Sequence, residues 1–197
     1  MLKYIRSTTL VAIFSIFLIL AGCSNNDFQG NMDVEVQDFN YVNQENEKVS
    51  LNDLKGTVWL ANFIFTNCKT VCPPMTRNMA DLQKQLNEEG ITDYRIVSFS
   101  VDPTNDTPEV LKSYISKYDA DTTNWDLLTG YDQEEIRAFA EKSFQTLAIP
   151  EPNSDQFMHG TSFFLVNKEG TVVKSYSGNE EVPFDEIVLD VEQLTKE

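Results

Sequence analysis

Basic side chains and histidine are scarce in this chain. Its 197 residues carry 15 lysines and arginines against 31 aspartates and glutamates, with one histidine, for a formal net charge of −16 at pH 7. So negative a chain repels the phosphate groups of nucleic acids and of anionic lipids. We therefore expect no nucleic-acid partner, whereas a metal ion or a cationic protein surface suits this charge. Internal repeats and low-complexity tracts are also missing, and the length is that of one domain.

Long apolar runs are missing as well. The run over residues 10–20 is too short to cross a bilayer, and it follows Lys3 and Arg6, as in a signal peptide. The next residues, Leu20-Ala-Gly-Cys23, resemble the lipobox of bacterial lipoproteins. This resemblance implies that residues 1–22 are a lipoprotein signal peptide, that Cys23 is lipidated, and that the protein is anchored at the extracytoplasmic face of the cell membrane. An uncleaved anchor and an ordinary secretory signal are the alternatives. The polar residues 23–32 are then a flexible tether.

Cysteine is the third scarce residue: there are three, and only Cys68 and Cys72 remain if Cys23 carries lipid. They follow an apolar, aromatic segment and precede Pro73 and Pro74, which indicates a buried strand, a loop and a helix that begins near the prolines. A helix N-terminus favours thiolate, which is the reactive and metal-binding form. A disulfide that closes so short a loop stabilises little through chain entropy. Redox chemistry or metal binding is therefore favoured over a purely structural bridge.

Hydrophobic periodicity predicts an α/β chain. Alternating segments around an asparagine-rich turn indicate a β-hairpin, and a nearly continuous apolar run indicates a strand buried on both faces. Strand, helix and strand in succession favour a parallel crossover. In order, we expect a hairpin over 34–42 and 48–51, a polar turn over 52–56, strands over 57–65, 94–101 and 125–129, helices over 75–86, 108–118 and 133–144, a loop over 150–156, strands over 161–167 and 171–176, and a last helix opened by Pro183.

This order of elements is that of a thioredoxin-like fold over residues 33–197, with an N-terminal β-hairpin and a central mixed sheet flanked by helices. The cysteine spacing is C-x-x-x-C rather than the C-x-x-C of redox thioredoxins. The stretch Phe65-Thr-Asn-Cys68-Lys-Thr-Val-Cys72-Pro-Pro-Met-Thr76 resembles the cysteine motif of the Sco family, membrane-attached thioredoxin-fold proteins involved in assembling the copper centre of cytochrome c oxidase. Residues 101–108, and His159 just ahead of the strand over 161–167, support the resemblance.

The resemblance implies a copper site formed by Cys68, Cys72 and His159. It also implies a metallochaperone role toward the copper-bearing subunit of cytochrome c oxidase, in the assembly of its copper A centre. Soft thiolates select Cu(I), and an added imidazole lets the site hold Cu(II) as well. Three protein ligands leave a position for a ligand of the partner, as metal transfer requires. The same sulfurs can close a Cys68–Cys72 disulfide, which would abolish the copper site.

Three alternatives stay open. The first is a thiol–disulfide oxidoreductase, in which Cys68 and Cys72 reduce cysteines of the oxidase subunit or of another extracytoplasmic protein. The second is a zinc site completed by a carboxylate, since closed zinc sites take four protein ligands. The third is a peroxidase, which would need Arg77 beside its reactive cysteine. Gly160-Thr161 stands where many thioredoxin-fold enzymes carry a cis-proline, which disfavours ordinary disulfide exchange.

Two carboxylates and two methionines are candidates for the surroundings of the ligands. Asp102 and Asp106 follow the next parallel strand, whose carboxyl end lies at the same edge of the sheet as the cysteines. Asp102 is the stronger candidate for a place beside the ligands, whereas turn or N-cap chemistry accounts better for Asp106. Met75 and Met158 flank the ligands in the sequence, and we expect them to pack rather than to bind copper.

Overall fold

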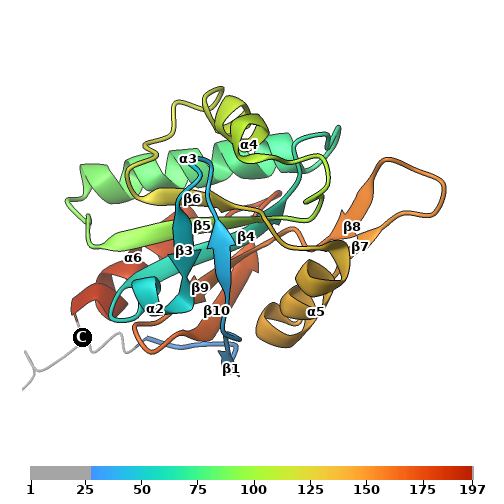
Figure 1. The fold of residues 1–197 in the computed structure, drawn as a ribbon. Helices are drawn as coiled ribbons and strands as arrows, with labels where there is room; N and C mark the ends of the chain where they lie inside the picture. The colour runs from blue at the N-terminus through green and yellow to red at the C-terminus, as the bar shows by residue number, and fades with distance from the viewer. Residues whose placement is uncertain (1–27, 197) are drawn as a thin grey trace, which may run out of the picture.

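Figure 1 shows the computed structural model, which describes residues 28–196. Residues 1–27 and 197, with the predicted signal peptide and Cys23, lie outside the described part. Within that part, no helix is both long and apolar enough to cross a membrane. The elements are β1 (Val34–Glu35), β2 (Asn40–Val42), β3 (Lys48–Ser50), α2 (Leu51–Leu54), β4 (Val58–Ile64), α3 (Cys72–Glu88), β5 (Tyr94–Ser100), α4 (Pro108–Ile115), β6 (Trp125–Leu128), α5 (Gln133–Phe144), β7 (Ala148–Pro150), β8 (Phe157–His159), β9 (Ser162–Val166), β10 (Thr171–Ser177) and α6 (Phe184–Lys196).

A six-stranded mixed sheet in the order β1-β10-β9-β4-β5-β6 forms the centre of the domain. β4, β5 and β6 run parallel, and α3 makes the crossover from β4 to β5. β9 pairs antiparallel with β4, β10 with β9, and β1 with β10. Helices lie on both sides of this sheet (Figure 1), so the predicted α/β, thioredoxin-like architecture is confirmed.

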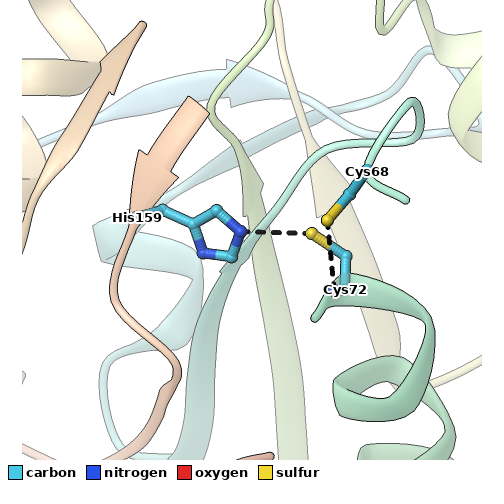
Figure 2. A group of neighbouring side chains, drawn as sticks. All are labelled: Cys68, Cys72 and His159. Atoms are coloured by element: carbon cyan, nitrogen blue, oxygen red, sulfur yellow. Dashed lines mark hydrogen bonds between the residues drawn. The ribbon is translucent and has the colours of Figure 1, made fainter. Parts of the chain in front are cut away.

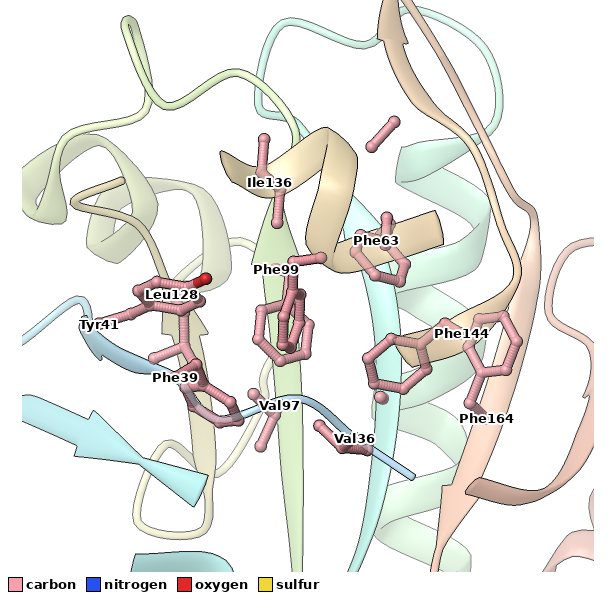
Figure 3. Close-up of a cluster of buried hydrophobic side chains, with 14 of the residues drawn as sticks. Val36, Phe39, Tyr41, Phe63, Val97, Phe99, Leu128, Ile136, Phe144 and Phe164 are labelled. Carbon is pink, nitrogen blue, oxygen red and sulfur yellow. The ribbon is translucent and has the colours of Figure 1, made fainter. Parts of the chain in front are cut away.

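The central strand β4 anchors the segment that carries the cysteines. All seven of its residues are buried, and alternate side chains enter two apolar clusters, one on each face of the sheet. Ile64 joins the cluster beneath α3, α4 and α6. Phe63 joins the cluster beneath α5, where its ring centroid lies 5.5 Å from that of Phe99 and 5.4 Å from that of Phe144 (Figure 3). A strand held on both faces gives the following loop a fixed starting point.

Most predicted elements are confirmed, and α5 has the predicted bounds. The polar turn expected over 52–56 is confirmed at residues 55–56 but wrong for residues 52–54, which belong to α2. This helix is capped by Ser50, whose N–H and Oγ donate to the Asp53 carboxylate. The strand expected over 34–42 is divided. β1 joins the edge of the main sheet, and β2 pairs with β3 as the predicted hairpin. α4 ends at Ile115, three residues earlier than expected.

A second small hairpin precedes β9 and was not predicted. β7 and β8 pair antiparallel, with Ala148 opposite His159, and the loop expected over 150–156 mostly connects them. The hairpin projects from the body of the domain beside α5 (Figure 1). His159 therefore lies on a paired strand rather than at the end of a loop.

Residues 28–32 differ from the flexible tether expected over 23–32. The N–H groups of Asn31 and Met32 both donate to the carbonyl oxygen of Val173 in β10, at 3.0 Å. Hydrogen bonds thus join part of the predicted tether to β10, while residues 23–27 lie outside the described part and the tether stays a prediction.

Candidate metal centre

Cys68 and Cys72 lie between the end of β4 and the first turn of α3 (Figure 2). Cys72 is the first residue of α3, and Pro73 and Pro74 follow it because the first turn of a helix needs no internal N–H donor. Both cysteines are free thiols in this structure. Cys72 is fully buried and Cys68 is 8% exposed, so a partner meets the Cys68 sulfur first.

The Cys68 sulfur accepts a backbone hydrogen bond and lies near a hydroxyl group. The Cys72 N–H, at the N-terminus of α3, donates to Cys68 Sγ at 3.3 Å, and Thr70 Oγ1 lies 3.9 Å from the same sulfur. The Cys72 thiol is the main cause that lowers the pKa of Cys68 from 9.0 to about 3, with His159 assisting, although burial opposes the shift. Cys68 is therefore a thiolate at neutral pH.

The Cys72 sulfur has the opposite character. Burial raises the pKa of Cys72 far above its ordinary value, and the adjacent Cys68 raises it further. The pair therefore holds one proton at neutral pH, and that proton resides on Cys72. It has two acceptors within reach, the Cys68 thiolate and the imidazole of His159.

The His159 ring is oriented by the carbonyl group that follows it. Nδ1 lies 2.9 Å from the Gly160 oxygen, which can only accept, so Nδ1 carries a proton and donates. In the neutral imidazole, Nε2 then holds a lone pair, and it faces Cys72 Sγ at 3.1 Å (Figure 2). Metal-ligating histidines are commonly fixed in this way. A Cβ on Gly160 would lie 2.1 Å from Thr146 Oγ1, so any larger residue there requires the Thr146 side chain to move.

Aromatic packing holds the β7–β8 hairpin against the cysteine segment. Phe65, which follows β4, is buried and its ring centroid lies 5.3 Å from that of Phe157 and 5.7 Å from that of His159. Edge-on aromatic contacts of this kind add about 0.5–1.5 kcal/mol beyond burial. These aromatic contacts help to keep the imidazole beside the sulfurs.

A set of exposed polar contacts closes the same junction from outside. The Asp155 carboxylate accepts from Asn67 Nδ2 at 2.9 Å and lies 3.5 Å from Lys69 Nζ, while Gln156 Nε2 donates to the Asn67 carbonyl at 3.3 Å. Hydrogen bonds from Gln156 and Asn67, and the charge of Lys69, lower the pKa of Asp155 to about 2. Asp155 was missed at the level of the sequence, because its contacts cross to a hairpin that was not predicted.

Of the two predicted carboxylates, Asp106 reaches the cysteine segment. It is fully buried, and accepts from Thr66 Oγ1 and Ser100 Oγ, each at 2.6 Å, and from the Thr66 N–H. Burial is the main cause that raises the pKa of Asp106. Both oxygens of Asp102 instead accept from the Asn105 amide, which is turn chemistry. The predicted loop thus reaches the cysteine segment, and Asp106 makes the hydrogen bonds to it, whereas a place for Asp102 beside the ligands stays a prediction.

Met75, Met158 and Arg77, which were also named from the sequence, do not belong to the group of ligand atoms. Met75 is fully buried in the apolar cluster beneath α3, which confirms the packing role expected for it. Met158 alternates with His159 along β8 and is 43% exposed. The Arg77 guanidinium stacks on the Tyr118 ring at 5.4 Å and donates to the Tyr118 carbonyl, so its described contacts do not support the peroxidase alternative.

Cys68, Cys72 and His159 form a group, called here the Cys–Cys–His group, whose ligand atoms all lie within 4.8 Å of one another. Metal bonds from thiolate and imidazole are about 2.0–2.3 Å long, so one ion can reach all three atoms after small side-chain movements. No carboxylate joins this group within residues 28–196, which gives no support to the zinc alternative. Two sulfurs and one imidazole are a donor set suited to copper.

These features define a class of protein: a thioredoxin-like domain with two thiols and an imidazole at a strand–helix junction. A family model described as SCO1/SenC matches residues 29–196. The SCO1 protein homolog of Bacillus subtilis is 50% identical over 180 residues, which are 91% of this chain and 93% of that protein. The chain therefore belongs to the SCO1/SenC family.

Solved structures agree with this assignment. A SCO1/SenC family lipoprotein from Bacillus anthracis is 49% identical with a TM-score of 0.79, over 83% of this chain and 95% of that one. BsSco, described with a disulfide switch and as a member of the Sco family of cytochrome c oxidase assembly proteins, is 49% identical with a TM-score of 0.78, over 85% and 98%. Bradyrhizobium japonicum ScoI, solved with copper bound, is 22% identical with a TM-score of 0.66, over 82% and 99%, and at that identity it shows the fold alone.

Proposed function

We propose that this protein binds copper at the extracytoplasmic face of the membrane, anchored through Cys23, and assists assembly of the copper A centre of cytochrome c oxidase. The observation that carries the proposal is the Cys–Cys–His group, with its ligand atoms within 4.8 Å of one another. The description of BsSco as belonging to a family of cytochrome c oxidase assembly proteins supports the assembly role. The description of the Bacillus anthracis relative as a lipoprotein supports the anchor.

The group is suited to a metal that arrives and leaves as cargo. Cys68 is already a thiolate, and His159 turns its Nε2 toward the sulfurs. Cys72 must give up its proton before it binds, since the thiolate is the ligand. Three protein ligands leave a coordination position that a ligand of the accepting protein can fill, so copper can pass between the proteins without becoming free.

Copper titration of the reduced chain tests the proposal. One copper per chain is expected. His159→Ala should weaken copper binding by at least about 10-fold, because even mutations of residues that only hydrogen-bond to metal ligands lower metal affinity by about 10–100-fold. Met158→Ala is the matched control because Met158 is adjacent on β8 but exposed, and it should bind as the native chain does. A chain that binds no copper, or a His159→Ala variant with native affinity and spectrum, would refute the proposal.

A second function, thiol–disulfide exchange, is favoured by one observation, the low pKa of the Cys68 thiol. The Cys68 thiolate would attack a target disulfide, break its S–S bond and release one target thiolate. Cys72 would then lose its proton, with His159 Nε2 as the nearby acceptor at 3.1 Å, and attack Cys68 Sγ. The second target thiolate would leave, and two electrons would pass to the target as the Cys68–Cys72 disulfide forms.

Deletion of the gene separates the two functions. If copper delivery is the role, added copper should restore cytochrome c oxidase activity in the deleted strain. If reduction is the role, copper should fail and the oxidase cysteines should accumulate as disulfides. A deleted strain with normal oxidase activity and reduced target cysteines would contradict both.

A further inference from the structure

Residues 28–32, which we call the clasp, are built to lie against β10. The Asn31 side chain acts as a piece of strand: its Nδ2 donates to the Ser175 carbonyl at 3.0 Å, and its Oδ1 accepts from the Ser175 N–H at 2.8 Å. The N–H groups of Asn31 and Met32 donate to the Val173 carbonyl. β1 covers only the first residues of β10, at Thr171 and Val172, so the clasp extends the cover along this edge strand.

Steric fit and packing also hold the clasp in place. A Cβ on Gly30 would lie 2.5 Å from the Val173 carbonyl oxygen, so only glycine allows this approach. Phe28 packs on the apolar cluster beneath α6, and its ring centroid lies 5.6 Å from Lys174 Nζ. That ammonium group is largely buried and pairs with Asp190 at 2.6 Å. Phe28 thus helps to shield a buried ion pair from water. If Phe28 left this position, apolar surface would be exposed to solvent.

We propose that the clasp keeps the domain close to the membrane, so that the Cys–Cys–His group serves acceptors that are themselves held at the bilayer surface. This inference rests on the proposed lipid anchor at Cys23. Five residue steps join Cys23 to Phe28 and can span at most about 17 Å, whereas eleven steps to Val34 could span about 37 Å if the clasp came loose.

The charge of the chain opposes a position close to the membrane. The formal net charge is −16 for the full chain, and it becomes −18 once residues 1–22, which carry Lys3 and Arg6 and no acidic residue, are removed. The domain is therefore repelled by the anionic lipids of a bacterial membrane, and a longer free segment between Cys23 and the domain would let it move outward. With the clasp in place, the short segment between Cys23 and Phe28 opposes that repulsion. It also restricts the metal site to acceptors near the membrane. Acceptors that are bound to the membrane remain within reach of the metal site. For acceptors that diffuse in solution, the anchor does not raise the frequency of encounter.

The height of the domain above a bilayer tests the inference. The full chain, purified with its lipid from bacterial membranes, is placed on a supported bilayer, and the height is measured by neutron reflectometry. Asn31→Ala and Gly30→Val, which remove the side-chain pairing and the close approach, should each raise the mean height, by up to about 20 Å, the difference between the two extended lengths. Ten Gly/Ser residues inserted between positions 27 and 28 should raise it without touching the clasp. Asn52→Ala, at an exposed asparagine of α2, is the matched control and should not.

Amide hydrogen exchange provides a second measurement that does not depend on lipid. The amides of Asn31 and Met32 should be protected in the native chain and lose that protection in the two clasp variants. Native heights in both clasp variants, with a higher domain in the insertion variant, would overturn the proposal, as would unprotected native amides. A chain that carries no lipid would overturn both the anchor and this use of the clasp. If the native chain binds no copper, only the proposed copper function is overturned.

Discussion

Alkylation of Cys68 should be nearly independent of pH between about 5 and 9. The structure gives this thiol a pKa of about 3 because the Cys72 thiol, with help from His159 and the backbone N–H groups, stabilises its thiolate. An ordinary thiol becomes ten times less reactive with each pH unit below its pKa, since only the thiolate attacks. Cys68 should stay ionised throughout this range, and burial should slow its reaction at every pH alike.

The expected rates follow from the two pKa values, 9.0 and about 3. At pH 5, Cys68 is about 99% thiolate, whereas an unperturbed thiol of pKa 9.0 is about 0.01% thiolate. A thiolate of lower pKa is also a weaker nucleophile, and a Brønsted slope of about 0.45 over six units costs roughly 500-fold. Before shielding by burial, Cys68 should therefore react roughly 20-fold faster than an ordinary thiol at pH 5 but roughly fivefold slower at pH 7.

The assay is alkylation by iodoacetamide from pH 4 to pH 9, with the modified peptide quantified by mass spectrometry. The urea-unfolded chain is the control, since both thiols should then titrate normally. Cys72→Ala should raise the pKa of Cys68 because it removes the main donor, and Cys72→Ser, which keeps a hydroxyl donor, should raise it less. A Cys68 rate that increases tenfold per unit from pH 5 to pH 8 in the folded chain would refute the reasoning.

Three further predictions concern stability, the hairpin and the proton balance. Lys174→Ala leaves Asp190 buried without its cation and should cost about 3 kcal/mol in free energy of unfolding, measured with urea; an unchanged midpoint would contradict the buried pair. Asp155→Ala removes only exposed contacts, so the urea midpoint should hardly move while amide exchange in β8 quickens; unchanged exchange would show that these contacts hold nothing. Cu(I) binding near pH 8 should release about one proton per copper, because Cys72 alone must deprotonate. Calorimetry in buffers of different ionisation enthalpy gives the count, and two protons would show that Cys68 is protonated.

The acidity of Cys68 also links stability to pH. Its pKa in the folded chain lies below the ordinary thiol value, so the folded state binds fewer protons than the unfolded state between these two values. The stabilisation is complete above the unfolded pKa of about 9 and is lost as the pH falls toward about 3. Cys68→Ser should remove this part of the pH dependence, which urea unfolding between pH 5 and pH 9 can measure.

The sequence predicted best where one short segment determines its own structure. Residues 57–65 are apolar on both faces, and β4 is buried along its whole length. The helix over 133–144 follows from its apolar spacing, and the structure adds Asp132, whose side chain caps it. By contrast, residues 52–54 of α2 were predicted as part of a polar turn, because the pairing of Ser50 with Asp53 that caps the helix was overlooked.

What the sequence did not predict depends on contacts between distant segments. The β7–β8 hairpin has strands of three residues, one of them ending in proline, and the packing of Phe157 on Phe65 holds it in place. Asn31 pairs with the edge strand β10 through its side chain. A polar side-chain contact of this kind produces no hydrophobic periodicity from which it could be predicted. The three ligands were named through a family resemblance, and only the structure shows that they come together.

The ligands are held with unequal firmness, and this has a consequence for cargo release. Cys68 and Cys72 are fixed by a strand buried on both faces and by the first turn of a 17-residue helix. His159 lies on a hairpin of three-residue strands, held by the packing around Phe65 and by the exposed contacts of Asp155. Local opening is easiest where buried contacts are fewest, so the hairpin should open before the cysteine segment does. If copper is the cargo, as proposed, the imidazole is then the ligand that leaves first, and the two sulfurs retain the metal until the acceptor's ligands replace them.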